Sequence, residues 1–314
     1  MTDSARMSAH AEMAWIPGGT FLMGSDAHYP EEAPAHEVTV SGFWMDTGLV
    51  TNADFRRFVE ATGHVTLAER PANPADYPGA DPAHLAPSSV VFRKTSGRVD
   101  LRNQFNWWTY VPGASWRHPL GPKSTLQGLE EHPVVHVAFE DAAAYARWAD
   151  KQLPTEAEWE FAARGGLPAA EFAWGDTLLV DGKHMANTWQ GEFPWQSHVE
   201  DGFESTSPVR SYPPNGYGLY DVAGNVWEWT TDWYQEHGKI TNACCGMENP
   251  RGGLLEQSYD PAMPQIAIPR KVMKGGSYLC APNYCRRYRP AARMAQPVDT
   301  SICHLGFRCI VRGP

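Results

Sequence analysis

Two cysteines separated by four residues, Cys280 and Cys285, are the residues of this chain best suited to chemistry. A close pair of thiols can form a disulfide, supply half of a zinc site, or hold Cu(I) in a soft two-coordinate site. A four-ligand zinc site needs a second pair of cysteine or histidine ligands nearby. The remaining cysteines do not supply such a pair, because they are Cys244 and Cys245 in tandem and Cys303 and Cys309 six apart. The spacing alone leaves the disulfide and the copper site open.

The two thiols can meet only if the chain bends between them. Side chains five positions apart on a strand point to opposite faces, because the strand period is two. Pro282 and Asn283 lie between the cysteines and are typical turn residues. The sequence therefore predicts a loop on which both thiols converge.

Composition limits the classes of protein to which the chain can belong. Its 314 residues can bury a full core, and 13 Trp with 28 Gly and 26 Pro indicate a loop-rich fold held by large aromatic side chains. A net charge of −10 argues against nucleic acid or an anionic membrane as partner. No run of about 18 apolar residues is present, and residues 1–12 lack the apolar core of a signal peptide. We expect a cytoplasmic protein with reduced thiols.

The pattern of residues predicts a single α+β domain over residues 13–314, after a disordered lead over residues 1–12. Alternating apolar residues between Gly and Pro predict strands, and capping signals followed by apolar spacing predict helices. The predicted strands cover residues 13–17, 18–25 and 36–45, and the predicted helices cover residues 51–63, 140–150 and 155–166. Residues 71–131 are poorly patterned, and we expect them to be an excursion of the same domain anchored by Trp107, Trp108 and Trp116.

Six motifs follow one another in an order that resembles the formylglycine-generating enzyme family, also called sulfatase-modifying factors. They are Gly18-Gly-Thr-Phe-Leu-Met-Gly, Leu153-Pro-Thr-Glu-Ala-Glu-Trp-Glu, Asn215-Gly-Tyr-Gly-Leu-Tyr, Gly224-Asn-Val-Trp-Glu-Trp, Lys274-Gly-Gly-Ser-Tyr-Leu-Cys and Leu305-Gly-Phe-Arg-Cys. The match runs from about Met13 to Cys309. Most of these motifs mark the wider superfamily, whereas the cysteine pair is the specific signal. The resemblance implies a modified C-type-lectin-like fold with little regular secondary structure.

The resemblance also implies a reaction. The cysteine of a Cys-x-Pro-x-Arg motif, in an unfolded or nascent type I sulfatase, would be oxidised by dioxygen to Cα-formylglycine. Cys280 and Cys285 match the pair that binds Cu(I) and carries catalysis, and Cu(I) prefers soft thiolate ligands. Ser277 matches an active-site serine, although a turn serine is an equal alternative. Trp227 would line the peptide groove, or it would be a core tryptophan.

Two structural calcium sites are implied by the resemblance alone. The first would use the side chains of Asn187 and Asp201 with the carbonyls of Thr188 and Phe203. The second would use Asp221 and Glu228 with the carbonyls of Gly224 and Val226. Mixed carboxylate, amide and carbonyl oxygens are what Ca²⁺ takes, but neither set has EF-hand spacing. Without the resemblance these residues would be turn formers.

Three further features have structural interpretations. Cys244 and Cys245 are expected to be structural. The eukaryotic relatives pair the position of Cys309 with one that is Ala146 here, so we expect Cys309 to be free. A second disulfide of those relatives is expected to be absent, because Ala163 and Pro290 occupy its positions. His132 and His136 resemble part of an iron motif of the superfamily. Pro133 and Ala138 do not fit that motif, so we expect structural histidines.

Two other classes of protein remain as alternatives. A catalytically silent sulfatase-binding or peptide-binding module of the same fold would be favoured by loss of the cysteine pair, which is present. A metal-free thiol–disulfide oxidoreductase could use the same loop, but no thioredoxin-like pattern precedes it. We expect a monomeric enzyme that binds copper and calcium.

Overall fold

The computed structural model describes residues 10, 12–239 and 247–313 as a mixed α+β fold in which loops are longer than the regular elements. The α-helices of this part of the chain are α2 (Asn52–Thr62), α3 (Phe139–Trp148) and α4 (Glu156–Arg164). The strands before α3 are β1 (Met13–Ile16), β2 (Gly19–Met23), β3 (His36–Val40), β4 (Phe43–Asp46), β5 (Ser88–Phe92) and β6 (Trp108–Pro112). The later strands are β7 (Leu179–Val180), β8 (Lys183–His184), β9 (Trp227–Trp233), β10 (Met247–Glu248), β11 (Arg270–Lys274), β12 (Arg293–Pro297), β13 (Leu305–Gly306) and β14 (Ile310–Arg312).

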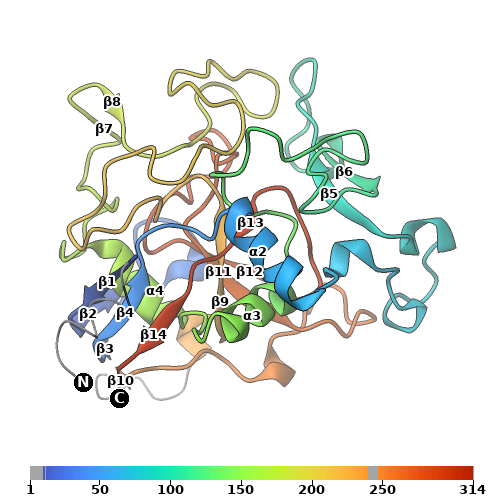
Figure 1. The fold of residues 1–314 in the computed structure, drawn as a ribbon. Helices are drawn as coiled ribbons and strands as arrows, with labels where there is room; N and C mark the ends of the chain where they lie inside the picture. The colour runs from blue at the N-terminus through green and yellow to red at the C-terminus, as the bar shows by residue number, and fades with distance from the viewer. Residues whose placement is uncertain (1–9, 11, 240–246, 314) are drawn as a thin grey trace.

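Three small sheets form the framework (Figure 1). The central sheet has the strand order β12-β11-β9-β13, in which β11 is antiparallel to both neighbours and β13 is parallel to β9. The other two have the orders β1-β4-β14 and β10-β3-β2. Strand β14, near the C-terminus, pairs with β4 and so joins the two ends of the described chain. This closure sets the Cys280–Cys285 loop, which follows β11, within the body of the domain.

The predicted strands near the N-terminus are confirmed. Residues 13–17 and 18–25 contain β1 and β2, and residues 36–45 cover β3 and all of β4 except its last residue, Asp46. Buried and partly exposed side chains alternate along β4, as the period of two requires. The lead over residues 1–12 lies almost entirely outside the described residues.

The predicted helices are confirmed within two residues at their ends. Thr51 and Thr155 accept a hydrogen bond from the third residue of α2 and α4, and each forms a capping box with that residue. Gly63 and Gly165 end these helices with φ of 68° and 59°, a left-handed conformation that favours glycine. Among the described residues, no helix is both long and apolar enough to cross a membrane.

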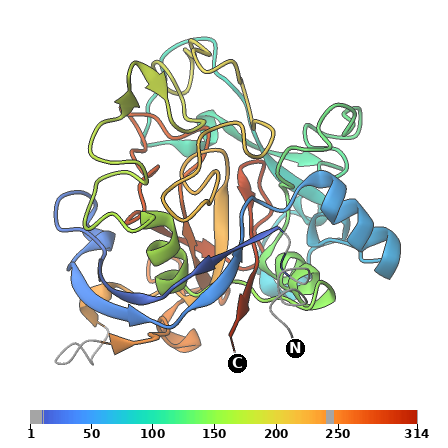
Figure 2. The same ribbon diagram turned by 60° about the vertical axis from the view of Figure 1, so that its left-hand side comes forward.

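Helix α4 lies between the strands of the N-terminal half and the central sheet (Figure 2). All nine of its residues are buried, including three glutamates and an arginine. A helix buried on every side must pair its charged groups internally, because an unpaired charge in the interior is costly. Helix α4 therefore supplies carboxylates to the interior, and Arg293, in the segment that follows the cysteine loop, pairs with one of them, Glu156.

The excursion over residues 71–131 has the expected anchors and one unexpected element. Trp107 and Trp116 are completely buried, and Trp108 is partly buried. The unexpected element is an antiparallel pair, β5 with β6, which the sequence analysis did not predict. The two strands are separated by 15 residues, whereas the sequence signals of a hairpin depend on a short turn between its strands. The pair was therefore not predictable from local sequence.

Candidate functional site

The loop that carries Cys280 and Cys285 brings the two thiols together, as predicted. Cys280 donates its backbone N–H to the carbonyl of Ser277 at 2.9 Å, and Cys285 donates to the carbonyl of Ala281 at 2.8 Å. These two turns fold the chain back on itself, and the two Sγ atoms lie 3.0 Å apart. Both cysteines are free thiols, whereas a disulfide would have its sulfurs about 2.05 Å apart.

A close backbone contact holds this loop against the segment that follows it. Gly276 has φ of 71°, and a Cβ atom there would lie 2.7 Å from the carbonyl oxygen of Arg287. Only glycine allows both the left-handed conformation and this approach. The Gly-Gly-Ser motif therefore sets the distance between the cysteine loop and residues 286–288.

The two thiols differ in protonation. Burial raises the pKa of Cys280 well above its usual value, and the hydrogen bond with Cys285 acts in the same direction. The same hydrogen bond and the positive charge of Arg287 lower the pKa of Cys285 to about 7. Cys280 therefore donates its proton toward a Cys285 sulfur that ionises near neutral pH. A thiolate, not a thiol, is the form that binds metals and reacts.

Arg287 connects the cysteine loop to an N-terminal segment that is distant in sequence. Its Nη1 lies 3.8 Å from the Sγ of Cys285, and its Nη2 donates to Glu31 at 2.6 Å. The guanidinium also lies over the ring of Tyr29, 3.8 Å from the centroid. Tyr29 and Glu31 were not predicted as site residues, because no local signal ties them to a loop 256 residues away.

The other basic residues after the loop are structural. Arg289 forms two hydrogen bonds with Glu32, and Arg293 forms two with Glu156 at 2.7 and 2.8 Å. All four side chains are almost completely buried. Breaking a buried pair leaves an uncompensated charge, so these pairs fix residues 286–293 beneath the loop.

Ser277 is completely buried, and its hydroxyl oxygen lies 3.0 Å from Nδ1 of His304. The backbone N–H of Leu279 donates to the same oxygen at 3.3 Å. Burial, with a further contribution from His136, lowers the pKa of His304 to about 3, so this histidine is neutral at physiological pH. Its ring packs against Trp108 at 4.9 Å. The only sequence signal for His304 is its position directly before the Leu-Gly-Phe-Arg motif.

Trp227 lies in the core in this structure. Its side chain is 1% exposed, in the cluster of buried residues that also contains both cysteines of the loop. Of the two roles considered for it, the core role fits this position. It supports the cysteine loop from within and has no exposed surface with which to line a groove.

The first candidate calcium set contains a buried oxygen without a donor. Asn187 is 1% exposed; its Nδ2 donates to Ser205, but its Oδ1 has no partner in the described part of the chain. The oxygens of Asp201 accept from the N–H of Phe203 at 3.1 Å and from the hydroxyl of Tyr212 at 2.9 Å. The carbonyl of Thr188 accepts from Gln190. The unpartnered amide oxygen fits a hard cation, whereas the other oxygens already accept hydrogen bonds.

The second candidate set is divided between two environments. Burial raises the pKa of Asp221 to about 6, and one of its oxygens accepts from the N–H of Arg210 at 2.7 Å. Glu228 instead binds Arg308 through two hydrogen bonds of 2.7 and 2.9 Å and accepts a third from Trp159. Asp221 retains capacity for a cation, but Glu228 is already neutralised by an arginine.

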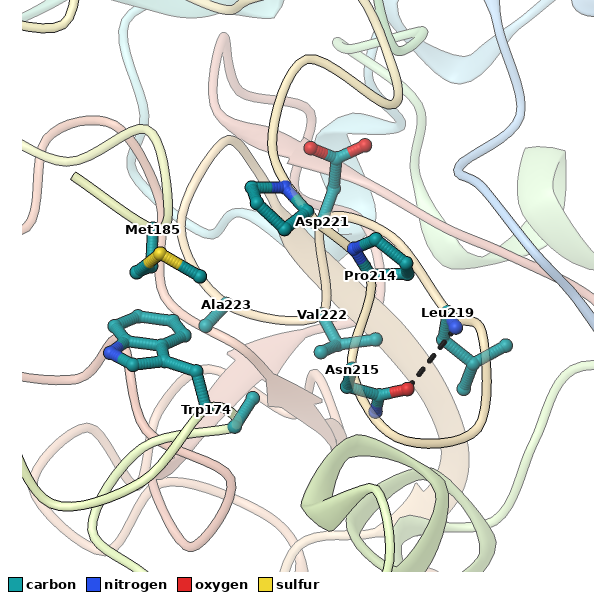
Figure 3. A pocket seen from close by; sticks show the side chains of 10 residues that line it. Trp174, Met185, Pro214, Asn215, Leu219, Asp221, Val222 and Ala223 are labelled. Atoms are coloured by element: carbon teal, nitrogen blue, oxygen red, sulfur yellow. Dashed lines mark hydrogen bonds between the residues drawn. The ribbon is translucent and has the colours of Figure 1, made fainter. Parts of the chain in front are cut away.

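A small cavity adjoins Asp221 (Figure 3). Its volume of about 20 Å³ has room for about one water molecule, so it is no substrate pocket. In the figure the Asp221 carboxylate extends away from Trp174 and Met185, which line the opposite side. Asn215 closes another edge by accepting from the N–H of Leu219 at 3.1 Å.

Both calcium sets are bonded to the cysteine loop through the backbone. Gly224 donates to the carbonyl of Gly275 at 2.9 Å, and Tyr278 donates to the carbonyl of Asn225 at 2.9 Å. Asn225 in turn donates to the carbonyl of Asn187 at 2.8 Å. The carbonyl of Val226 belongs to the same short segment. Any ion that ordered these loops would therefore brace the cysteine site.

The histidines are structural, as predicted. His136 is completely buried, with Nδ1 2.6 Å from the hydroxyl of Ser89 and Nε2 2.9 Å from the carbonyl of Pro119. His132 lies 3.0 Å from the hydroxyl of Thr206. In residues 10, 12–239 and 247–313, no group of three or more His, Cys, Asp or Glu side chains could hold a metal. A zinc site made only of such ligands therefore has no counterpart in this part of the chain.

The remaining cysteines lie apart from this chemistry. Cys309 is a buried free thiol in the same core cluster as Ala146. Cys303 is also free and accepts from the N–H of Phe92 at 3.3 Å. The tandem pair Cys244 and Cys245 lies outside the described residues.

Comparisons with known proteins identify the family to which the chain belongs. Residues 1–313 match the model of the sulfatase-modifying factor enzyme 1-like domain. The chain is 52% identical over 302 residues to a formylglycine-generating enzyme of Mycobacterium tuberculosis, with 95% of this chain and 97% of the relative covered. It is 47% identical to one of Streptomyces coelicolor, covering 94% and 87%. An inactive Cα-formylglycine-generating enzyme 2 of mouse is 38% identical, covering 95% and 84%. The solved structure of PvdO from Pseudomonas aeruginosa has the same fold, with a TM-score of 0.60 at 24% identity over 96% of this chain and 94% of the other.

Proposed function

Because the chain belongs to the formylglycine-generating enzyme family, we propose that it is a copper-dependent oxidase that converts the cysteine of a sulfatase Cys-x-Pro-x-Arg motif to Cα-formylglycine with dioxygen. The chain is an enzyme that acts on peptidyl cysteine, as its relatives of 43–52% identity are named for forming formylglycine. The observation that carries the proposal is the pair of free thiols 3.0 Å apart. The expected product is an activated type I sulfatase.

Cys280 and Cys285 would hold the copper ion. Two adjacent thiol sulfurs, one of which ionises near neutral pH, form a soft donor set that fits Cu(I). When bound, Cu(I) would supply a site for the substrate thiolate and a one-electron donor toward dioxygen. Arg287, held by Glu31, places a positive charge beside Cys285 and favours its thiolate form.

The geometry also suits entry of a peptide. Cys280 and Cys285 are 2% and 8% exposed, and the residues between them, Pro282 to Tyr284, are exposed. We expect a substrate cysteine to approach the thiols past these exposed residues. We expect an extended segment of an unfolded or nascent sulfatase, since a folded protein cannot place a buried cysteine there. We expect the enzyme to act as a monomer.

A silent module of the same fold is the first alternative function. An inactive relative is 38% identical to this chain, so the fold alone does not establish catalysis. The buried, free cysteine pair of this chain favours an enzyme. A metal-free thiol oxidoreductase could use the same loop, but no thioredoxin-like pattern precedes the cysteine pair in the sequence.

Structural calcium is the second part of the proposal. The unpartnered Oδ1 of Asn187 and the raised pKa of Asp221 mark buried oxygens that a cation would satisfy. Asp201, Thr188 and Phe203 would complete the first set. The carbonyls of Gly224 and Val226 would contribute to the second, with Glu228 shared with Arg308. A cytoplasmic location is proposed on the four described cysteines, which are all free.

Titration of the reduced protein with Cu(I) tests the metal site. One tight site should be present in the wild type and lost in both Cys280→Ser and Cys285→Ser. Cys309→Ala, which removes an equally buried free thiol outside the loop, should keep it. Unchanged stoichiometry in both loop variants would exclude copper binding between these thiols.

A further inference from the structure

Tyr288, three residues after Cys285, is a buried phenol with no hydrogen-bond partner for its hydroxyl among the described residues. Its side chain is 1% exposed. A buried hydroxyl without a partner costs free energy, and a phenylalanine would fill the same space without that cost. Such a group calls for a specific explanation, and one explanation is a ligand that supplies the acceptor.

The ring of Tyr288 is fixed from two sides. It stacks on Phe172 with centroids 6.0 Å apart, and Phe172 stacks on Trp174 at 5.2 Å. On the backbone side, a Cβ atom at Gly276 would lie 2.8 Å from the amide nitrogen of Tyr288. The hydroxyl therefore cannot reach bulk water unless this part of the core rearranges.

Tyr288 lies in the part of the core that also contains the cysteine pair. Tyr288 shares a core cluster with both Cys280 and Cys285, and negative charge on these sulfurs raises its pKa. Burial is the larger cause, and together they raise the pKa of Tyr288 to about 12, so the hydroxyl keeps its proton at neutral pH. Three indole N–H groups, those of Trp107, Trp116 and Trp189, also lack a partner among the described residues, but none of them is part of the segment that follows Cys285.

Two other polar side chains near the thiols are already engaged. The hydroxyl of Ser277 contacts His304 at 3.0 Å, and two nitrogens of Arg287 bind Glu31. A substrate thiolate that enters this buried place leaves its water ligands behind, so it needs a donor inside the protein.

We propose that Tyr288 is a substrate-binding residue that donates its hydroxyl hydrogen to the sulfur of the substrate cysteine when that sulfur lies beside Cys280 and Cys285. This inference rests on the proposed function, since it requires a peptidyl cysteine as ligand. It assigns the unpartnered hydroxyl an acceptor that is present only in the complex.

Tyr288→Phe tests this inference because it removes the hydroxyl and keeps the ring. The dissociation constant would be measured without oxygen, on Cu(I)-loaded protein, for a Cys-x-Pro-x-Arg peptide and for its Cys→Ala twin. We expect the variant to bind the cysteine peptide about tenfold more weakly, or about 1.4 kcal/mol, and the alanine peptide unchanged. Tyr145→Phe, at a buried tyrosine of α3 packed against Phe55, is the matched control and should change neither constant.

Thermal unfolding of the metal-free Tyr288→Phe protein gives a second readout. Its melting temperature should equal or exceed that of the wild type, because an unpaired buried hydroxyl is removed. A clear fall in melting temperature would mean that the hydroxyl is structural and would overturn the inference. So would wild-type affinity for the cysteine peptide, or an equal loss for both peptides. Failure of the proposed function gives a different result: the wild type would bind the cysteine peptide but not oxidise it. If the wild type binds the cysteine peptide and the alanine peptide equally, both this inference and the proposed function are wrong.

Discussion

The buried pair between Arg308 and Glu228 should be a sensitive ionic contact of the fold. Arg308 is 0% and Glu228 1% exposed, and two hydrogen bonds of 2.7 and 2.9 Å join them. Arg308→Met leaves the carboxylate uncompensated in the interior, which costs about 3–5 kcal/mol. Unfolding entropy of about 2.1 cal/mol/K per residue converts this cost into a fall in melting temperature of about 5–8 °C for a chain of this length.

Differential scanning calorimetry of four proteins measures this effect. The double variant Glu228→Gln with Arg308→Met should recover most of the loss, since glutamine removes the charge but still accepts from Trp159. The control is Arg98→Met, because Arg98 binds Glu192 with the same two-point geometry at 2.7 Å on the surface. Its melting temperature should not change measurably. If Arg308→Met shifts the melting temperature no more than Arg98→Met, the reasoning about buried charge is wrong.

Three further predictions concern calcium, pH and the glycine contact. Chelation should lower the melting temperature of the wild type by mass action and should affect Asn187→Leu and Asp221→Asn less; no shift in protein shown to have lost its metal would refute the calcium proposal. Burial lowers the pKa of His136 from its ordinary 6.5 to about 4. As the pH falls, this histidine is therefore protonated in the unfolded chain before it is protonated in the folded protein. Stability should therefore fall by up to about 3 kcal/mol between pH 6.5 and 4, and denaturant titrations of His136→Gln should not show this component. Gly276→Ala should destabilise more than Gly218→Ala, since both have positive φ but only Gly276 has a backbone atom within 3 Å of the added methyl group; equal melting temperatures would contradict the close contact.

Local signals explain what the sequence could predict of the fold. The capping boxes at Thr51 and Thr155 lie within one helical turn, so α2 and α4 were predictable from a few residues. The central sheet was not predictable, because β9 pairs with β11 across about 40 residues and with β13 across about 80. Which strands pair over such distances depends on the fold of the whole chain, and the local pattern of apolar residues does not show it.

The same division applies to the site. Cys280 and Cys285 lie on one turn, so their convergence followed from Pro282 and Asn283. Glu31 and His304, which contact the site from opposite ends of the chain, have no local signal that ties them to it. The family resemblance supplied the function, whereas these contacts became visible only in three dimensions.

Oxidation of a peptide by the copper-loaded protein tests the central claim most directly. A peptide with a Cys-x-Pro-x-Arg motif would be incubated with reduced protein, Cu(I), a reductant and dioxygen, and the aldehyde would be detected by mass spectrometry after capture with a hydrazine. We predict formylglycine at the cysteine for the wild type and for Cys309→Ala, and none for Cys280→Ser or Cys285→Ser. The same yield of aldehyde from the loop variants, or none from the wild type shown to hold one Cu(I), would contradict the assignment of catalysis to this cysteine pair.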